Sequence, residues 1–197
     1  MELRKGQKIS LDEDFLSVKF ERKSGALEID TSAFLLQAGG KVSGDDDFIF
    51  YGNPRHKSGS VVYLEGDSIE IDLQKIPRDV EKISLTATIY EPEKRKQNFS
   101  HMSNAVLKIS GTRTGTEIIF PLQSFTTETA IVLGEIYRYK GVWKFGAVGA
   151  GFNGGLKSLC ENFGIEVIDE PETPPAPPPK ITVERSAKKK SAPQKKS

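Results

Sequence analysis

The feature that most constrains the fold of this 197-residue chain is a series of short apolar-rich segments separated by turn residues. FLSVKFER alternates apolar and polar residues from Phe15 to Phe20, and about nine such segments follow one another within about 135 residues. A period of two predicts strands with one buried face, and this spacing favours antiparallel strands over alternating strand–helix units. The sequence therefore predicts a mainly β protein, an antiparallel β-sandwich.

Two short helical segments are predicted beside the strands. EPEKRKQNF has Pro92 near its start, where proline suits the first turn of a helix. GLKSLCENFG places four apolar side chains on one face, and Gly164 ends it. These side chains are Leu156, Leu159, Cys160 and Phe163. Cys160 is the single cysteine, so no intramolecular disulfide can form, and its place on that face predicts a core residue and not a nucleophile.

The composition changes at DEPETPPAPPPK, residues 169–180. We expect a domain over residues 1–168 and a disordered Pro-rich and Lys-rich tail over residues 169–197, because repeated prolines and a polar low-complexity sequence cannot build a core. From Lys180 onward the tail has seven Lys or Arg and one acid, Glu184. Such a tail either raises solubility or contacts an acidic partner, nucleic acid or an anionic membrane surface.

The apolar runs are all too short to cross a bilayer, which takes roughly 20 residues. The N-terminus MELRKGQKIS has no apolar signal-peptide core behind its charges. The sequence therefore predicts a cytoplasmic protein without a transmembrane segment.

Three consecutive carboxylates, Asp45, Asp46 and Asp47, precede the apolar run FIFY. Like charges this close repel, so they form either a solvated turn or part of a site for a hard cation such as calcium. The spacing does not fit an EF-hand loop, because the sixth position is Phe50 and the twelfth is His56. In an extended stretch Asp45 and Asp47 would point one way and Asp46 the other.

Three further acids are candidate ligands from other segments: Asp30, Asp67 and Glu135. Asp30 and Glu135 lie among apolar residues on predicted strands, where an unpaired carboxylate is costly to bury. An outward-facing strand position is the alternative for each.

The segment GAGFNG, residues 149–154, fits the G-x-G-x-x-G pattern of dinucleotide-binding folds and lies between a predicted strand and a helix. No second strand–helix–strand half follows, so we expect glycines that permit close packing and no nucleotide site. His56 and His101 have no Ser, Cys or acid at a diagnostic spacing, and no P-loop, H-E-x-x-H or G-x-S-x-G occurs. The sequence predicts a protein without enzymatic activity.

Taken together, the segments resemble the tellurium-resistance TerD family of bacterial stress proteins. The resemblance covers roughly residues 1–168 and rests on these segments in the family's order: DTSAFLL, DDDFIFYGNP, GSVV, GDS, EKRKQNF, SNAVLKI, TETAIVLGEIYR, WKFGAVGAGFNGGL and LCENFGIEV. It implies a β-sandwich that binds calcium through loop carboxylates and acts in tellurite resistance and related stress responses, alongside other such proteins, without established catalysis. The ligands expected on this basis are Asp30, Asp45, Asp46, Asp47, Asp67 and Glu135.

Two departures from the family's pattern bear on calcium. Glu28 stands where the first Asp of an acidic pair is usual, and the long acidic loop of the family is reduced to Gly66, Asp67 and Ser68. Shortening a turn leaves the sandwich intact but removes oxygen ligands, so we expect weaker calcium binding. The alternatives are an adaptor that has lost calcium and works through protein contacts, and a tether that acts through the basic tail.

Overall fold

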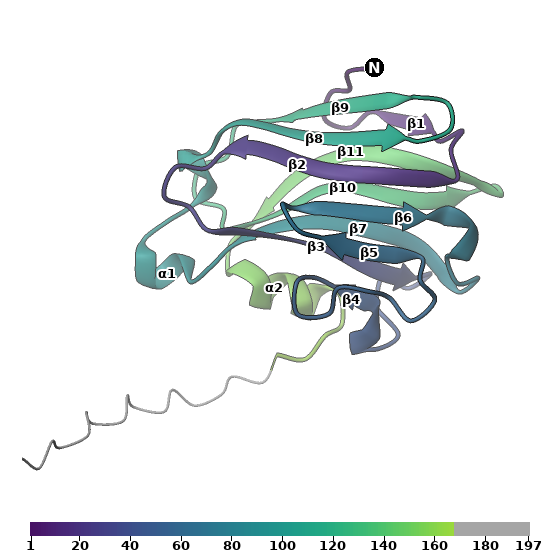
Figure 1. Cartoon of the computed structure of the whole chain (residues 1–197). Helices are drawn as coiled ribbons and strands as arrows, with labels where there is room; N and C mark the ends of the chain where they lie inside the picture. Colours follow the sequence, from purple (N-terminus) through teal and green to yellow (C-terminus); the bar gives the residue numbers. More distant parts are fainter. Residues whose placement is uncertain (168–197) are drawn as a thin grey trace, which may run out of the picture. The chain divides into compact units, whose positions relative to one another are not determined.

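A computed structural model describes residues 1–167, which form two antiparallel sheets packed face to face (Figure 1). The six-stranded sheet has the order β1 (Lys8–Ser10), β11 (Val142–Phe152), β10 (Ala130–Tyr139), β7 (Val80–Ile89), β3 (Ile29–Gln37) and β4 (Phe48–Ile49). The five-stranded sheet has the order β5 (Val61–Leu64), β6 (Ser68–Asp72), β2 (Phe15–Lys23), β8 (Ser103–Gly111) and β9 (Glu117–Leu122). The predicted β-sandwich is confirmed. Residues 168–197, which include the predicted disordered tail, lie outside the described residues.

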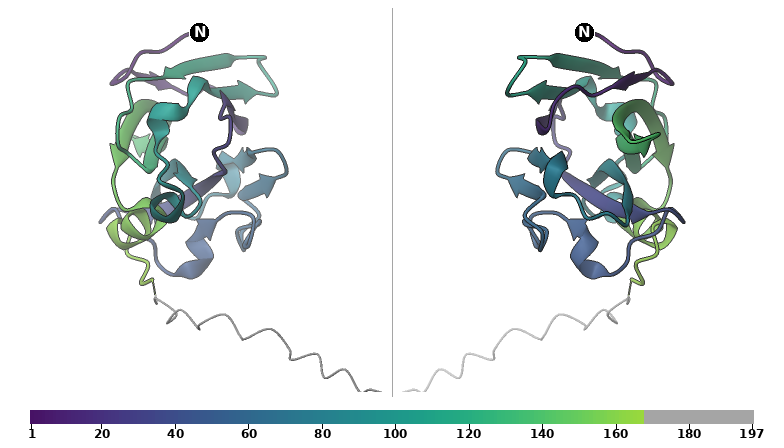
Figure 2. Two further views of the ribbon diagram at one scale, coloured as in Figure 1. Left: turned by 90° about the vertical axis from the view of Figure 1, so that its left-hand side faces the viewer. Right: turned by 90° about the vertical axis from the view of Figure 1, so that its right-hand side faces the viewer.

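The two sheets face each other (Figure 2), and the main core lies between their inner faces. On β2, the alternating residues Leu16, Val18 and Phe20 are buried, as the period of two predicts. From the other sheet, Ile136 and Phe145 are fully buried in the same cluster. The alternation in the sequence therefore identified the inner face of β2 correctly.

A second core lies on the outer face of the six-stranded sheet, beneath α2 (Gly155–Asn162). Leu159, Cys160 and Phe163 pack there, as expected, against side chains of the sheet that include Phe34 and Leu36 on β3. The expectation for Leu156 is wrong, because this side chain is 40% exposed. Leu156 lies in the first turn of this eight-residue helix, and the buried stripe is therefore limited to its second half and to Phe163.

A β-bulge in β10 changes which residues face outward. The register of β10 with both of its neighbours shifts between Val132 and Gly134. Before the bulge Val132 belongs to the outer core beneath α2, whereas after it Ile136 belongs to the inner core. Outward positions are therefore even-numbered before the bulge and odd-numbered after it.

The N-terminal segment connects the edges of the two sheets. Residues 1–3 lie along β9, where the Leu3 N–H donates to the Ile119 carbonyl at 2.8 Å, and β1 then pairs with β11. The sequence analysis missed β1, whose three residues are too few for a periodic pattern. The predicted surface helix is confirmed as α1 (Pro92–Arg95), with Pro92 in its first turn. Neither helix of residues 1–167 has the length and hydropathy of a membrane-spanning segment.

Candidate metal sites

The three consecutive aspartates form a single 3₁₀ turn, Asp45–Asp47, between β3 and β4. The expectation of an extended stretch with alternating side chains is wrong, because Gly44 begins a turn in which the Asp47 N–H donates to the Gly44 carbonyl at 3.0 Å. Asp45 and Asp46 are exposed, and the Asp46 carboxylate lies 3.9 Å from Lys57 Nζ. Asp47 alone is buried.

Asp47 and His56, both buried, form the centre of a polar network whose outer members, Ser43 and Ser58, are partly accessible to solvent. Asp47 Oδ2 accepts hydrogen bonds from the N–H and the hydroxyl of Ser43, at 2.8 and 2.6 Å, and Asp47 Oδ1 lies 3.1 Å from His56 Nε2. Burial alone would raise the pKa of Asp47, but the bonds from Ser43 and the contact with His56 outweigh it and hold the pKa below its ordinary value. Both carboxylate oxygens of Asp47 already have protein partners.

The opposite side of the His56 ring completes the network. His56 Nδ1 lies 2.7 Å from the Ser58 hydroxyl and accepts a hydrogen bond from the Ser58 N–H at 3.2 Å. Because Nδ1 is placed to accept this bond, the geometry favours the neutral tautomer with its proton on Nε2, which faces Asp47. No diagnostic spacing in the sequence pointed to these partners of His56: the fold brings Asp47 from nine residues upstream, and the turn after the histidine supplies Ser58.

A second acidic cluster lies at the start of β3 and in the β5–β6 turn. Asp67 Oδ2 accepts a hydrogen bond from Arg22 Nη1 at 2.8 Å, and its Oδ1 accepts one from the Thr31 hydroxyl at 3.2 Å. The Arg22 guanidinium is mostly buried and also donates to the carbonyls of Phe20 and Ile29, both at 3.1 Å. No local pattern in the sequence indicated this role of Arg22, since its partners come from three different segments.

Asp30 belongs to the same cluster but is not tied down. This carboxylate is half-buried, and no hydrogen bond or ion pair from residues 1–167 reaches it. Burial, followed by repulsion from Asp67 and then from Glu28, raises the pKa of Asp30, while Arg22 acts in the opposite direction. The cluster therefore holds more negative charge than Arg22 offsets.

Glu135 lies apart from both groups, on β10. Its carboxylate forms an ion pair with Lys82 at 3.0 Å on the outer face of the six-stranded sheet. Glu135 therefore occupies an outward-facing strand position, which was the alternative to a metal ligand.

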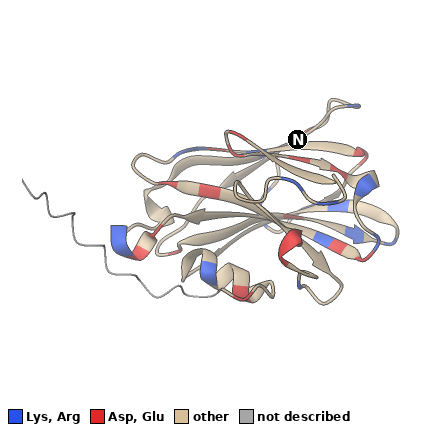
Figure 3. Cartoon of the chain, turned by 60° about the horizontal axis from the view of Figure 1, so that its bottom comes forward, with Lys and Arg blue, Asp and Glu red and all other residues tan. Residues whose placement is uncertain are grey.

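The six predicted ligands thus occupy three places. Asp47 precedes Phe48, and Phe48 pairs with Phe34 on β3. Phe34 lies four residues along β3 from Asp30, which at about 3.4 Å per residue separates Asp47 from Asp30 by about 14 Å or more. Glu135 pairs with Ser84 on β7, and Ser84 pairs with Phe34, so Glu135 lies two strands away from β3. Within residues 1–167 no group of three or more His, Cys, Asp or Glu is arranged to hold a metal. Acidic and basic residues are interspersed over the side seen in Figure 3.

Of the three places, the one around Asp30 and Asp67 fits calcium best. Calcium prefers six to eight oxygen ligands with flexible geometry, and Asp30 offers carboxylate oxygens that have no other partner in the described part of the chain. Asp67 would have to share its oxygens with Arg22 and Thr31. The donor set is therefore compatible with calcium but incomplete, and a guanidinium already contributes positive charge.

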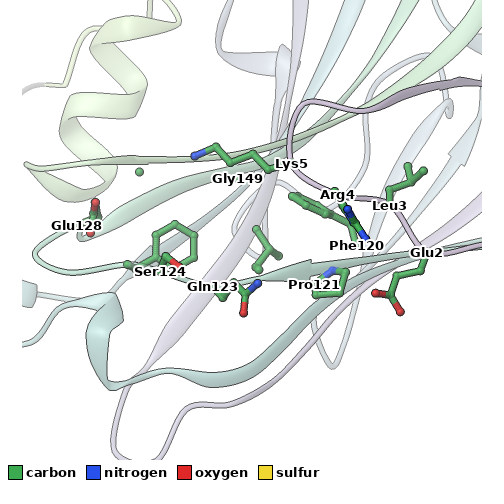
Figure 4. Close-up of a pocket in the computed structure, with 13 residues that line it drawn as sticks. Glu2, Leu3, Arg4, Lys5, Phe120, Pro121, Gln123, Ser124, Glu128 and Gly149 are labelled. Atoms are coloured by element: carbon green, nitrogen blue, oxygen red, sulfur yellow. The ribbon is translucent and has the colours of Figure 1, made fainter.

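The glycines of GAGFNG lie mostly within β11, which is antiparallel to both of its neighbours. A dinucleotide fingerprint requires a parallel strand followed by a loop, so this arrangement opposes the nucleotide alternative. Gly149 has φ +55°, and a Cβ there would lie 3.2 Å from Phe120 Cζ, while a Cβ at Gly151 would lie 2.3 Å from Glu128 Cγ. Both glycines line a groove of about 690 Å³ beside the N-terminal segment, together with Arg4, Lys5 and Pro121 (Figure 4).

Cys160 shows none of the properties of a nucleophile. Its side chain is buried beneath α2, and burial, with a smaller contribution from Glu161, raises the pKa of its thiol to about 11. The prediction of a core cysteine is confirmed.

Comparison with known proteins agrees with the resemblance seen in the sequence. The profile of the TerD domain matches residues 1–163. The tellurium resistance protein TerD of Alcaligenes sp is 43% identical over 150 residues, which cover 70% of this chain and 78% of that protein. General stress protein 16U of Bacillus subtilis (strain 168) is 40% identical over 152 residues, covering 71% of this chain and 79% of that protein.

A solved structure supports the same fold. The crystal structure of a homologue of the telluride resistance protein TerD from Streptomyces coelicolor A3(2) superposes with a TM-score of 0.56 at 13% identity, covering 75% of this chain and 95% of that one. At this identity the likeness concerns the fold alone. Since the domain profile spans most of the chain and the two relatives above are 40–43% identical over more than two thirds of it, the chain belongs to the TerD family.

Proposed function

We propose that this protein is a non-enzymatic stress-response protein of the tellurium-resistance type that acts in the cytoplasm and binds calcium weakly at Asp30 and Asp67. The observation that carries the calcium site is the half-buried Asp30 carboxylate, which lies beside Asp67 without a hydrogen-bonding partner among residues 1–167. A divalent cation would relieve the repulsion between the two carboxylates, which raises the pKa of Asp30. The names of the relatives support the role in stress and tellurium resistance.

Arg22 favours a second candidate, an adaptor that has lost calcium and works through contacts with other tellurium-resistance or stress proteins. Its guanidinium is fixed by Asp67 and two backbone carbonyls, so it supplies a permanent positive charge where a cation would bind. Like charges repel, and a calcium ion beside Arg22 binds less tightly than it would beside a neutral residue. The third alternative, a tether to nucleic acid or a membrane surface, depends on the basic tail, which lies outside the described residues.

Calorimetric titration of the full chain with calcium, beside melting curves in EDTA and in calcium, separates the two candidates. The proposal expects binding at high micromolar to millimolar calcium that Asp30→Asn abolishes. Asp45→Asn combined with Asp46→Asn, a matched loss of exposed acids, tests the predicted ligands of the 3₁₀ turn and should leave binding at Asp30 intact. If the wild type shows neither heat nor stabilisation at 10 mM calcium while Arg22→Gln gains both, the adaptor candidate is favoured and the calcium proposal fails.

A further inference from the structure

The outer face of the six-stranded sheet has two parts with different chemistry. One part, over β3, β7 and the start of β10, is covered by α2. After the bulge in β10, the outward residues are Glu135, Tyr137 and Tyr139, and none of these belongs to the core beneath α2. This second part of the face is bare in the described chain.

Lysines converge on the bare part from three strands. Lys82 on β7 and Lys144 on β11 lie directly opposite Tyr137, one on each side, and Lys8 on β1 lies opposite Gly146 in the neighbouring row. We call this surface the lysine–tyrosine face; it consists of Lys5, Lys8, Lys82, Tyr137, Tyr139 and Lys144. No carboxylate of residues 1–167 forms an ion pair with Lys5, Lys8 or Lys144. Glu135, which lies beside them, is already paired with Lys82.

The face contains a hollow of about 400 Å³. Gly146 has no side chain to fill the hollow, which is lined by three lysines, Lys5, Lys8 and Lys82, and by one acid, Glu135, whose charge is paired with that of Lys82. A concave surface surrounded by ammonium groups has a positive potential and attracts anions.

Tyr139 extends this surface toward the hairpin tip. It is 49% exposed, and the ammonium groups of Lys140 and Lys144 lie 5.4 and 5.1 Å from the centre of its ring. A cation–π contact at an exposed site is weak, so either lysine can leave the ring for a phosphate group. The ring then becomes available to a planar ligand.

We propose that the lysine–tyrosine face binds single-stranded nucleic acid, with lysines on the phosphates and Tyr137 and Tyr139 beneath the bases. The two tyrosines lie two residues apart on one strand, about 7 Å, so two bases can each contact a ring. A positively charged surface with aromatic side chains is the arrangement that binds single strands without reading their sequence. In a duplex the bases are stacked within the helix and do not reach the two rings.

The test measures binding of fluorescein-labelled dT12 and U12 to the full-length chain by anisotropy at 50 and 200 mM salt. Every variant retains the basic tail, so the contribution of the tail is constant. Lys8→Glu combined with Lys144→Glu should weaken binding at least tenfold and reduce the slope of log K against log salt by about 1.4, for two lost phosphate contacts. The matched control, Lys19→Glu combined with Lys23→Glu on the other sheet, has the same net charge and should weaken binding much less.

Tyr139→Ser separates base contacts from charge. It should weaken oligonucleotide binding roughly five- to a hundredfold while binding of inorganic polyphosphate stays unchanged. Melting curves of each variant check that the fold is retained. The proposal is overturned if the two charge-reversed double variants bind dT12 equally. It is also overturned if Tyr139→Ser binds the oligonucleotides as the wild type does, which would describe a surface that accepts any polyanion, or if phosphatidylserine vesicles bind and the oligonucleotides do not.

Discussion

Replacing Asp47 by Asn tests whether the polar network around Asp47 and His56 stabilises the β3–β5 region. In the wild type one carboxylate oxygen accepts two hydrogen bonds from Ser43 and the other accepts the Nε2 proton of His56. Asparagine keeps the size of the side chain but has one acceptor oxygen and one NH₂ group. Whichever way the amide is oriented, its NH₂ faces another donor.

A change of tautomer does not rescue the variant. Moving the ring proton of His56 from Nε2 to Nδ1 would give the amide NH₂ an acceptor, but the Ser58 N–H would then lose the acceptor that it has at Nδ1. At least one donor that is shielded in part from water therefore loses its protein partner, which costs about 1–3 kcal/mol, and loss of the charged acceptor for Ser43 adds about 1 kcal/mol. We expect Asp47→Asn to lower the free energy of unfolding by about 2–4 kcal/mol, or the Tm by about 4–16 °C.

Thermal and urea unfolding of the full chain at pH 7 in EDTA measure this loss. Asp46→Asn, one residue away and exposed to solvent, is the control and should lie within about 0.5 kcal/mol of the wild type. The pKa of Asp47 is lower in the folded state than in the unfolded state. Its ionised carboxylate therefore contributes fully to the free energy of unfolding above the unfolded-state pKa of about 3.9, and this contribution is lost as the pH falls through the folded-state pKa. The difference between wild type and Asp47→Asn should narrow below about pH 4. If the two aspartate variants are equally stable at pH 7, the network does not hold this region.

Three further predictions concern other parts of the chain. In EDTA, Asp30→Asn should be more stable than the wild type at pH 7. The raised pKa of Asp30 means that its ionised carboxylate opposes folding above the unfolded-state pKa of about 3.9, so unfolding curves should show the gain in stability disappearing below about pH 4. A variant that is less stable than the wild type at pH 7 would contradict this. Gly149→Ala should cost about 1–2 kcal/mol in urea unfolding, since alanine at φ +55° is strained and its Cβ meets Phe120, whereas Gly115→Ala would show the effect of φ alone. Labelling of Cys160 by a thiol reagent at pH 8 should be slow in the native protein and fast in urea, because the thiol is buried and its pKa is about 11; equal rates would refute its place in the core.

The elements that the sequence predicted well are those whose pattern is local. The alternation from Phe15 to Phe20 depends only on the pleat of β2, and the spacing of Leu159, Cys160 and Phe163 depends only on the turn of α2. Gly164, with φ +86°, ends that helix as its position in the sequence indicates. Such features need no knowledge of distant segments, so one sequence was enough for the fold class and for both helices.

The sites depended on contacts between distant residues, and these only the tertiary structure decided. Three neighbouring aspartates look alike in the sequence, but only Asp47 is buried, because Ser43 and His56 converge on it. Arg22 reaches Asp67 across 45 residues, which no local pattern reveals. The bulge in β10 likewise turns Tyr137 outward by a shift of register with two neighbouring strands. Periodicity shows which side chains share a face, whereas burial, pairing and charge depend on what the rest of the chain places beside them.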